Sequence, residues 1–142
     1  MSIRNLLSLG AAALLALAPA GCSDGPKVAK VSGTLTYQGK PVPNATIHFV
    51  PAYGRPSWAQ TDAEGKFKVN YDADQDGAVV GTHKVYLEYR PITQAEQEAV
   101  MYGALPKPPK DFAVIYDKYG PEKSTLTVEI KKDTRDLKLE LE

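Results

Sequence analysis

Three carboxylates at alternate positions are the clearest candidate for metal chemistry in this sequence. The stretch DADQDG, residues 72–77, places Asp72, Asp74 and Asp76 at the first, third and fifth positions of a turn, with glycine at the sixth. Calcium loops of the EF-hand type share this first half, because alternate carboxylates converge on one cation and glycine allows the sharp turn. The twelfth position should carry a bidentate Glu and instead carries His83. We therefore expect a solvated acidic turn, with calcium as the alternative and no other metal.

The two histidines, His48 and His83, do not follow the pattern of a zinc or catalytic site. They fall on different predicted strands and have no cysteine or acidic neighbour at metal-ligand spacing. His48 is out of phase with the apolar residues Ile47 and Phe49 and should face solvent, whereas His83 comes near the start of its strand. A general base needs an oriented partner, and none is visible beside either histidine. Strings typical of serine hydrolases, zinc proteases and phosphate-binding loops are also missing, so we expect no enzyme and no cofactor.

Two aromatic residues, Tyr53 and Trp58, flank the turn between the second and third predicted strands. Aromatic side chains exposed beside a loop can stack on sugar rings or anchor a protein partner. The competing interpretation is packing at the end of the domain, where amphipathic aromatics are often partly buried. These two side chains are the candidate ligand contacts of the sequence.

The N-terminal segment has the three regions of a secretory signal peptide. Arg4 precedes an apolar run over residues 6–18, and small residues before Cys22 provide a cleavage site. The run is too short for a membrane-spanning helix, which needs about 20 apolar residues. Two cleavages compete. Ordinary signal peptidase would cut after Ala20, and lipoprotein processing would cut before Cys22, although Pro19 stands where the lipobox usually has Leu, Val or Ile.

Cys22 favours the lipoprotein alternative. It is the only cysteine of the chain, so it cannot form an internal disulfide, and a free thiol is an oxidation liability in an exported protein. We expect removal of residues 1–21, diacylglycerol on Cys22, and a polar tether over residues 22–30. Ser23 after the cysteine favours the outer membrane over the inner one, and cleavage after Ala20 would instead give a secreted soluble protein.

Alternation of apolar and polar residues predicts an all-β domain over residues 31–142. Turns rich in Gly, Pro, Asn and Asp bound segments of period two, which is the pattern of half-buried strands. Seven strands are predicted, over residues 31–37, 46–50, 57–61, 66–71, 84–90, 126–130 and 137–141. Seven such strands indicate a β-sandwich. Its core should contain an apolar side chain from most strands: Leu35, Phe49, Phe67, Leu87, Val128 and Leu139.

The alternation of apolar and polar residues stops over residues 92–115. Thr93 and Glu96 form a T-x-x-E capping box, helix formers continue to Tyr102, and Gly103 suits the end of a helix. Three prolines follow within a few residues. We therefore predict one short helix and a proline-rich loop, inserted before the last two strands. Connections of this length are often functional, so the insertion is a second candidate contact region.

Three stretches carry a family pattern: VSGTLTYQGKPVPNATIHFVP, AQTDAEGKFKV and GAVVGTHKVYLEY, over about residues 31–89. They resemble the carboxypeptidase regulatory-like domains, and the tail IYDKYGPEKSTLTVEI resembles the closing segment of short bacterial lipoproteins built on that domain. The resemblance implies a transthyretin-like or Ig-like β-sandwich with a binding or supporting role. Transthyretin-like hydrolases acting on 5-hydroxyisourate end in Tyr-Arg-Gly-Ser, whereas this chain ends in LKLELE, so that activity is not expected.

Charge indicates no long-range partner. The chain has 17 basic and 17 acidic side chains, interspersed and without a basic stripe, so nucleic acid is not an expected partner. We expect a non-enzymatic lipoprotein of the cell envelope, held at the membrane by its anchor. It would contact an envelope protein or polysaccharide through residues 52–58 and the insertion. The alternative is a ligand-binding module for carbohydrate or calcium, at the loop aromatics or the acidic loop.

Overall fold

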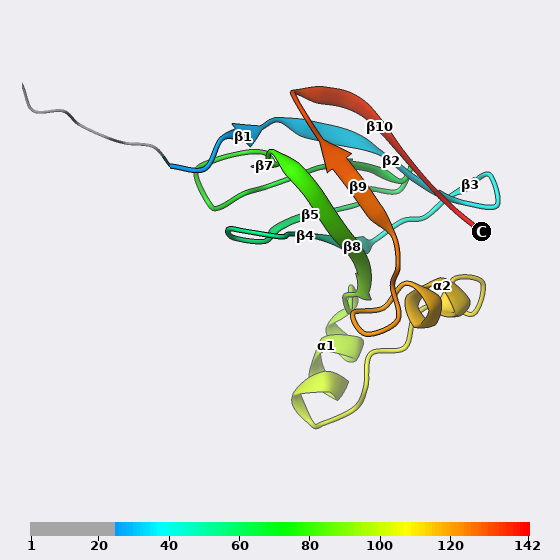
Figure 1. The fold of residues 1–142 in the computed structure, drawn as a ribbon. Helices are drawn as coiled ribbons and strands as arrows, with labels where there is room; N and C mark the ends of the chain where they lie inside the picture. The colour runs from blue at the N-terminus through cyan, green and yellow to red at the C-terminus, as the bar shows by residue number, and fades with distance from the viewer. Residues whose placement is uncertain (1–24) are drawn as a thin grey trace, which may run out of the picture.

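The computed structural model describes residues 25–142, which form an all-β sandwich with two short helices (Figure 1). The strands are β1 Val28–Ala29, β2 Val31–Tyr37, β3 Lys40–Pro41, β4 Ala45–Pro51, β5 Ser57–Gln60, β6 Lys66–Lys68, β7 Ala78–Val79, β8 Gly81–Tyr89, β9 Thr127–Ile130 and β10 Thr134–Leu141. The helices are α1 Gln94–Met101 and α2 Ala113–Lys118. The predicted fold class is confirmed, and each of the seven predicted segments overlaps one of these strands.

One sheet has the strand order β5-β4-β8-β9, with every neighbouring pair antiparallel. The period of two in the sequence accounts for its two faces. Ile47 and Phe49 of β4 are buried, as are Val85 and Leu87 of β8, while the residues between them face the other way. This sheet therefore has one apolar face toward the core and one polar face toward solvent.

The second sheet is centred on β2. Strand β10 pairs with one edge of β2 in parallel, and β6 and β3 pair antiparallel with the other edge. Gly33 of β2 is required by close packing, because a Cβ there would lie 1.9 Å from the backbone oxygen of Leu137 on β10. The sheets also meet at one side, where Trp58 of β5 and Asn70 exchange two backbone hydrogen bonds of 3.0 and 2.7 Å.

The core lies between these two sheets. Phe49 from one sheet and Phe67 from the other meet there, with ring centroids 6.2 Å apart. Five of the six predicted core residues are buried: Leu35, Phe49, Phe67, Leu87 and Leu139. The sixth, Val128, is only partly buried, because β9 is the edge strand of its sheet and is covered on one side alone.

The segment between β8 and β9 contains two helices where the sequence predicted one. Helix α1 follows the prediction: Thr93 and Glu96 form both bonds of the capping box, and Gly103 has a φ of +89° just past the helix end. Helix α2 was not predicted. It has six residues and no side-chain N-cap, and packing explains it, since Ile115 is fully buried in the core and Tyr116 and Tyr119 pack against it.

Regular structure also begins earlier than expected, at Val28. Val28 and Ala29 form β1, which pairs antiparallel with β7, and Val80 donates a backbone hydrogen bond to Lys27. The sequence assigned these positions to the tether because the stretch is short and lies next to Gly25 and Pro26. The pairing is with a segment 50 residues away in the chain, which local alternation does not reveal.

Candidate functional site around Trp58

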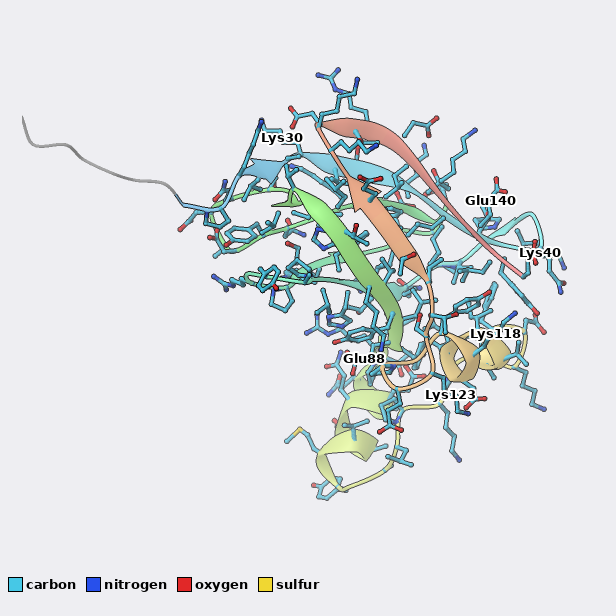
Figure 2. All side chains as sticks on the ribbon, in the orientation of Figure 1. Lys30, Lys40, Glu88, Lys118, Lys123 and Glu140 are labelled. Atoms are coloured by element: carbon cyan, nitrogen blue, oxygen red, sulfur yellow. The ribbon has the colours of Figure 1, made fainter. Side chains whose placement is uncertain are left out.

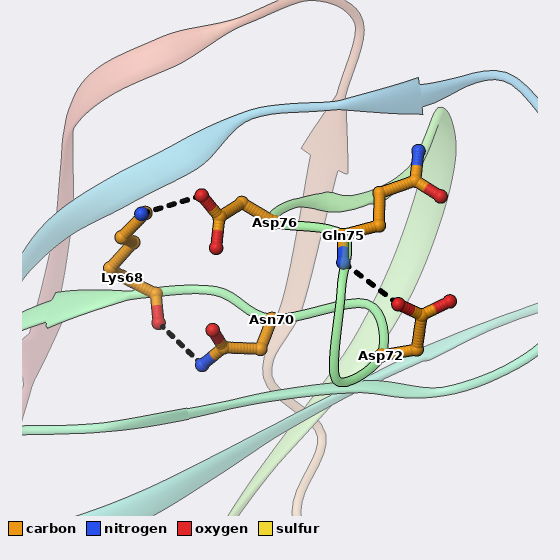
Figure 3. Close-up of polar contacts among 5 residues, drawn as sticks. All are labelled: Lys68, Asn70, Asp72, Gln75 and Asp76. Carbon is orange, nitrogen blue, oxygen red and sulfur yellow. Dashed lines mark hydrogen bonds and ion pairs between the residues drawn. The ribbon is translucent and has the colours of Figure 1, made fainter.

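The acidic loop uses its carboxylates to shape itself. Asp72 Oδ1 accepts a hydrogen bond of 2.9 Å from the backbone N–H of Asp74. It also accepts one of 2.8 Å from the backbone N–H of Gln75 (Figure 3). Asp76 forms an ion pair of 2.5 Å with Lys68 on the neighbouring strand (Figure 3). The three carboxylates therefore do not converge on a common point. Among residues 25–142 there is no group of three or more potential metal ligands.

His83 belongs to the core. Its side chain is fully buried, its Nε2 donates to the backbone oxygen of Val79 at 2.6 Å, and its ring packs edge-on against Phe49. Its Nδ1 has no partner among the described residues. This histidine points inward on β8, so it contributes to packing and is out of reach of a ligand at the surface.

His48 lies on the opposite, outer face of the same sheet, as predicted. It is in register with Trp58 on β5 and with Tyr86 on β8, which makes one row across three strands. Its ring stacks on Tyr86 with centroids 4.5 Å apart, and its Nε2 lies 2.8 Å from Oε2 of Glu88. Burial raises the pKa of Tyr86, and the nearby Glu88 carboxylate raises it further. The carboxylate of Glu88 is thus oriented by His48, and the ring of His48 is in turn fixed by stacking on Tyr86.

A surface hollow of about 430 Å³ opens beside this row. Trp58, 42% exposed, lines it together with Arg90 and Pro91, and Thr46, His48 and Glu88 also contribute side chains. Figure 2 shows Glu88 at the end of β8 that leads into α1. The hollow therefore combines one large aromatic surface with a hydroxyl, a carboxylate and a guanidinium.

Tyr53, the other predicted ligand contact, does not line this hollow. It lies in the turn after β4 with 90% of its surface exposed. The two aromatics that sequence reasoning grouped together are thus separated by the fold, because Trp58 is an outward-facing strand residue and Tyr53 is a turn residue. Glu88 and Arg90 were not predicted as members of the site. Glu88 lies on the outward phase of β8 and Arg90 directly follows that strand, but their position beside Trp58 depends on the strand order.

Glu96 fixes the start of α1 beside the hollow. Its Oε2 accepts hydrogen bonds from the backbone N–H groups of Ile92 and Thr93, at 3.1 and 3.0 Å, and from the Thr93 hydroxyl. Its Oε1 accepts the hydroxyl of Tyr89 at 3.0 Å. The backbone bond from Thr93, followed by those from Ile92 and Tyr89, lowers the pKa of Glu96 from 4.5 to about 2.

The tyrosines next to this carboxylate show the opposite effect. Burial raises the pKa of Tyr89, and the hydrogen bond to Glu96 and the charge of Glu96 raise it further. Tyr89 packs edge-on against Tyr116 of α2 with centroids 5.6 Å apart. Burial, with a smaller contribution from Tyr89, raises the pKa of Tyr116 to about 12. Both tyrosines therefore remain neutral hydrogen-bond donors at ordinary pH.

Acid should loosen the start of α1. Because the folded state lowers the pKa of Glu96, its stabilising contribution is complete above pH 4.5 and is lost as the pH falls toward 2. We expect the amide resonances of Ile92 and Thr93 to shift with a midpoint at a pH of about 2 in an NMR titration. Glu96→Gln should remove this transition. A midpoint at 4.5 in the wild type would contradict the four hydrogen bonds assigned to this carboxylate.

The proposed lipidation site lies outside the described residues. Cys22 and the signal segment precede residue 25, where the description begins. Within residues 25–142 no helix has the length and apolar character needed to cross a bilayer. Comparison with known proteins adds no assignment, because no protein-family model, no curated protein and no solved structure matches this chain.

Proposed function

We propose that this chain is a non-enzymatic ligand-binding module of the cell envelope, and that the hollow beside Trp58 binds a sugar ring. The observation that carries the proposal is the pairing of an exposed tryptophan with an oriented carboxylate. Trp58 and Glu88 line the same hollow, and Glu88 is held 2.8 Å from His48. Aromatic faces pack against the C–H groups of sugars, and fixed carboxylates accept hydrogen bonds from their hydroxyls.

The remaining side chains of the hollow fit the same ligand. Thr46 can donate and accept, and the guanidinium of Arg90 presents several donors to ring and hydroxyl oxygens. Arg90 has no hydrogen bond or ion pair to another residue in the described part of the chain. A polyhydroxylated ring would therefore find donors and acceptors together with an apolar surface.

The sheet pairing argues against an extended peptide as the ligand. Peptides commonly bind by adding a strand to a free sheet edge. Here β4 pairs with β5 and β8 on its two sides, and β8 pairs with β4 and β9. Trp58 itself pairs with Asn70. No edge of β4 is therefore free beneath the hollow, so a ligand there would be recognised through side chains.

Binding without cleavage is favoured by the number of carboxylates. Glycoside hydrolases usually act with two carboxyl groups on either side of the scissile bond. Of the described residues that line the hollow, only Glu88 has a carboxylate, and it is paired with His48. The proposal of binding without cleavage rests on this single carboxylate.

The position of the anchor would leave the hollow accessible. Strand β1, which follows the tether, and helix α1 lie at opposite ends of β8 (Figure 1). Nine strand residues span about 30 Å. A lipid on Cys22 would therefore hold the β1 end at the membrane and direct the hollow away from it.

Cys22→Ser should release the protein into the soluble fraction, and an unmodified wild-type N-terminus at Gly21 would contradict the anchor.

A sugar panel tests the binding proposal. Thermal unfolding of the mature protein would be followed with glucose, galactose, mannose and N-acetylglucosamine and with their oligomers. A ligand at 100 times its Kd adds about 2.7 kcal/mol of stability, which raises the Tm by on the order of 10 °C in a domain of this size. We expect such a rise with at least one sugar. Unchanged Tm values across the whole panel would overturn the proposal.

A further inference from the structure

We infer that the ligand is a polysaccharide chain, and that the α1 insertion forms a second subsite for it; this inference rests on the proposed function. A second hollow of about 460 Å³ lies next to the one beside Trp58. Arg90 and Pro91 line both hollows, so the two are contiguous. The rest of the second hollow comes from β5 and from the α1 segment, through Gln60, Ile92, Gln97 and Val100.

The second hollow repeats the chemistry of the first. Ile92 and Val100 are 50% and 37% exposed, and they provide apolar surface for the C–H face of a sugar ring. Gln60 and Gln97 provide amide donors and acceptors for hydroxyl groups. Neither amide forms a side-chain hydrogen bond with another described residue. Both are thus available to a ligand that continues past Arg90.

Helix α1 contributes little to the core. We therefore infer that its role is to line the second hollow. None of its residues is buried, and its side-chain hydrogen bond to β8 is made from its first turn. There Glu96 accepts hydrogen bonds from Tyr89, Ile92 and Thr93. This arrangement fixes the helix next to the hollow before any ligand binds, which reduces the entropy cost of binding.

A chain of several rings would occupy both hollows at once. One ring would lie beside Trp58 and Glu88, and a following ring would lie over Ile92 and Val100, with Arg90 between them. The gain from linked rings is a gain in effective concentration, so an oligomer should bind more tightly than its monomer. If the first hollow were the whole site, the affinity of an oligomer would exceed that of its monomer by no more than a factor equal to its number of equivalent rings.

Calorimetry with matched sugars tests this inference. The mature protein would be titrated with glucose and N-acetylglucosamine and with their β-1,4-linked tetramers. We expect one tetramer to bind at least tenfold more tightly than its monomer. The double variant Gln97→Ala, Val100→Ala should reduce the tetramer affinity to within fourfold of that of the monomer. Met101→Ala, on the same helix but outside both hollows, should bind the tetramer like the wild type.

The possible failures are distinguishable. A tetramer that binds no more than fourfold tighter than its monomer, or a tetramer advantage that survives the double variant, would overturn the second subsite and leave the sugar site beside Trp58 intact. Absence of binding by all four sugars, together with unchanged Tm values across the whole sugar panel, would overturn the inference together with the proposed function. Circular dichroism of the double variant checks that α1 is retained, and loss of its helical signal would redirect the test to the single variant Gln97→Ala.

Discussion

Replacing Phe67 by alanine is expected to lower the free energy of unfolding by about 3–5 kcal/mol, the usual cost of truncating a buried phenylalanine. Phe67 is 5% exposed and lies on the inner face of β6, where its ring packs 6.2 Å from that of Phe49 across the two sheets. A domain of this size has a total stability of about 5–15 kcal/mol. The variant should therefore unfold at a much lower denaturant concentration.

Lys66→Ala is the matched control for this measurement. Lys66 is next to Phe67 on β6 but points outward and is exposed. Its replacement should change the free energy of unfolding by no more than about 0.5 kcal/mol. Urea unfolding of the wild type and both variants gives the comparison. A Phe67→Ala protein as stable as the wild type would mean that the inner and outer faces of β6 are wrongly assigned.

Replacing Trp58 by alanine is expected to weaken sugar binding at least thirtyfold. Tryptophan is the residue type most often dominant in binding sites, and its truncation there typically costs about 2 kcal/mol or more, which is about thirtyfold in Kd. The fold should tolerate the change, because Trp58 is 42% exposed and its pairing with Asn70 uses backbone atoms. Calorimetric titration with the sugar that gives the largest thermal shift measures the loss.

Tyr53→Ala separates the two aromatic candidates. Tyr53 is 90% exposed and lies outside the hollow, so its removal should leave the sugar affinity unchanged. If both variants lost sugar affinity equally, the sugar site would instead lie at the turn between β4 and β5. A Trp58→Ala protein that binds with wild-type affinity would exclude the hollow as the sugar site.

Seven of the strands were predictable from the sequence because apolar and polar residues alternate along them. The alternation in β2, β4 and β8 identified both the fold class and the inward-facing residues. The capping box identified α1 for a similarly local reason, since Thr93 and Glu96 bond to each other's backbone. Such features depend on neighbours within a few residues, and those neighbours are visible in the chain.

Elements that depend on distant partners were not predictable in this way. Helix α2 is short and uncapped, and the burial of Ile115 against strands far away in sequence stabilises it. Strand β1 has only two residues and exists through its pairing with β7. The candidate site has the same origin. Trp58 and Glu88 come from β5 and β8, and they line one hollow because both strands pair with β4.

The most direct test of the central claim is the fluorescence of Trp58 during titration with sugar. Trp58 is the only tryptophan of the chain, so its emission reports on the hollow alone. A sugar ring packed against the indole would exclude water from it, and the emission should change in a saturable way, with the same Kd that calorimetry gives. Binding detected by calorimetry with unchanged emission, or no saturable change with any sugar of the panel, would contradict a sugar site beside Trp58.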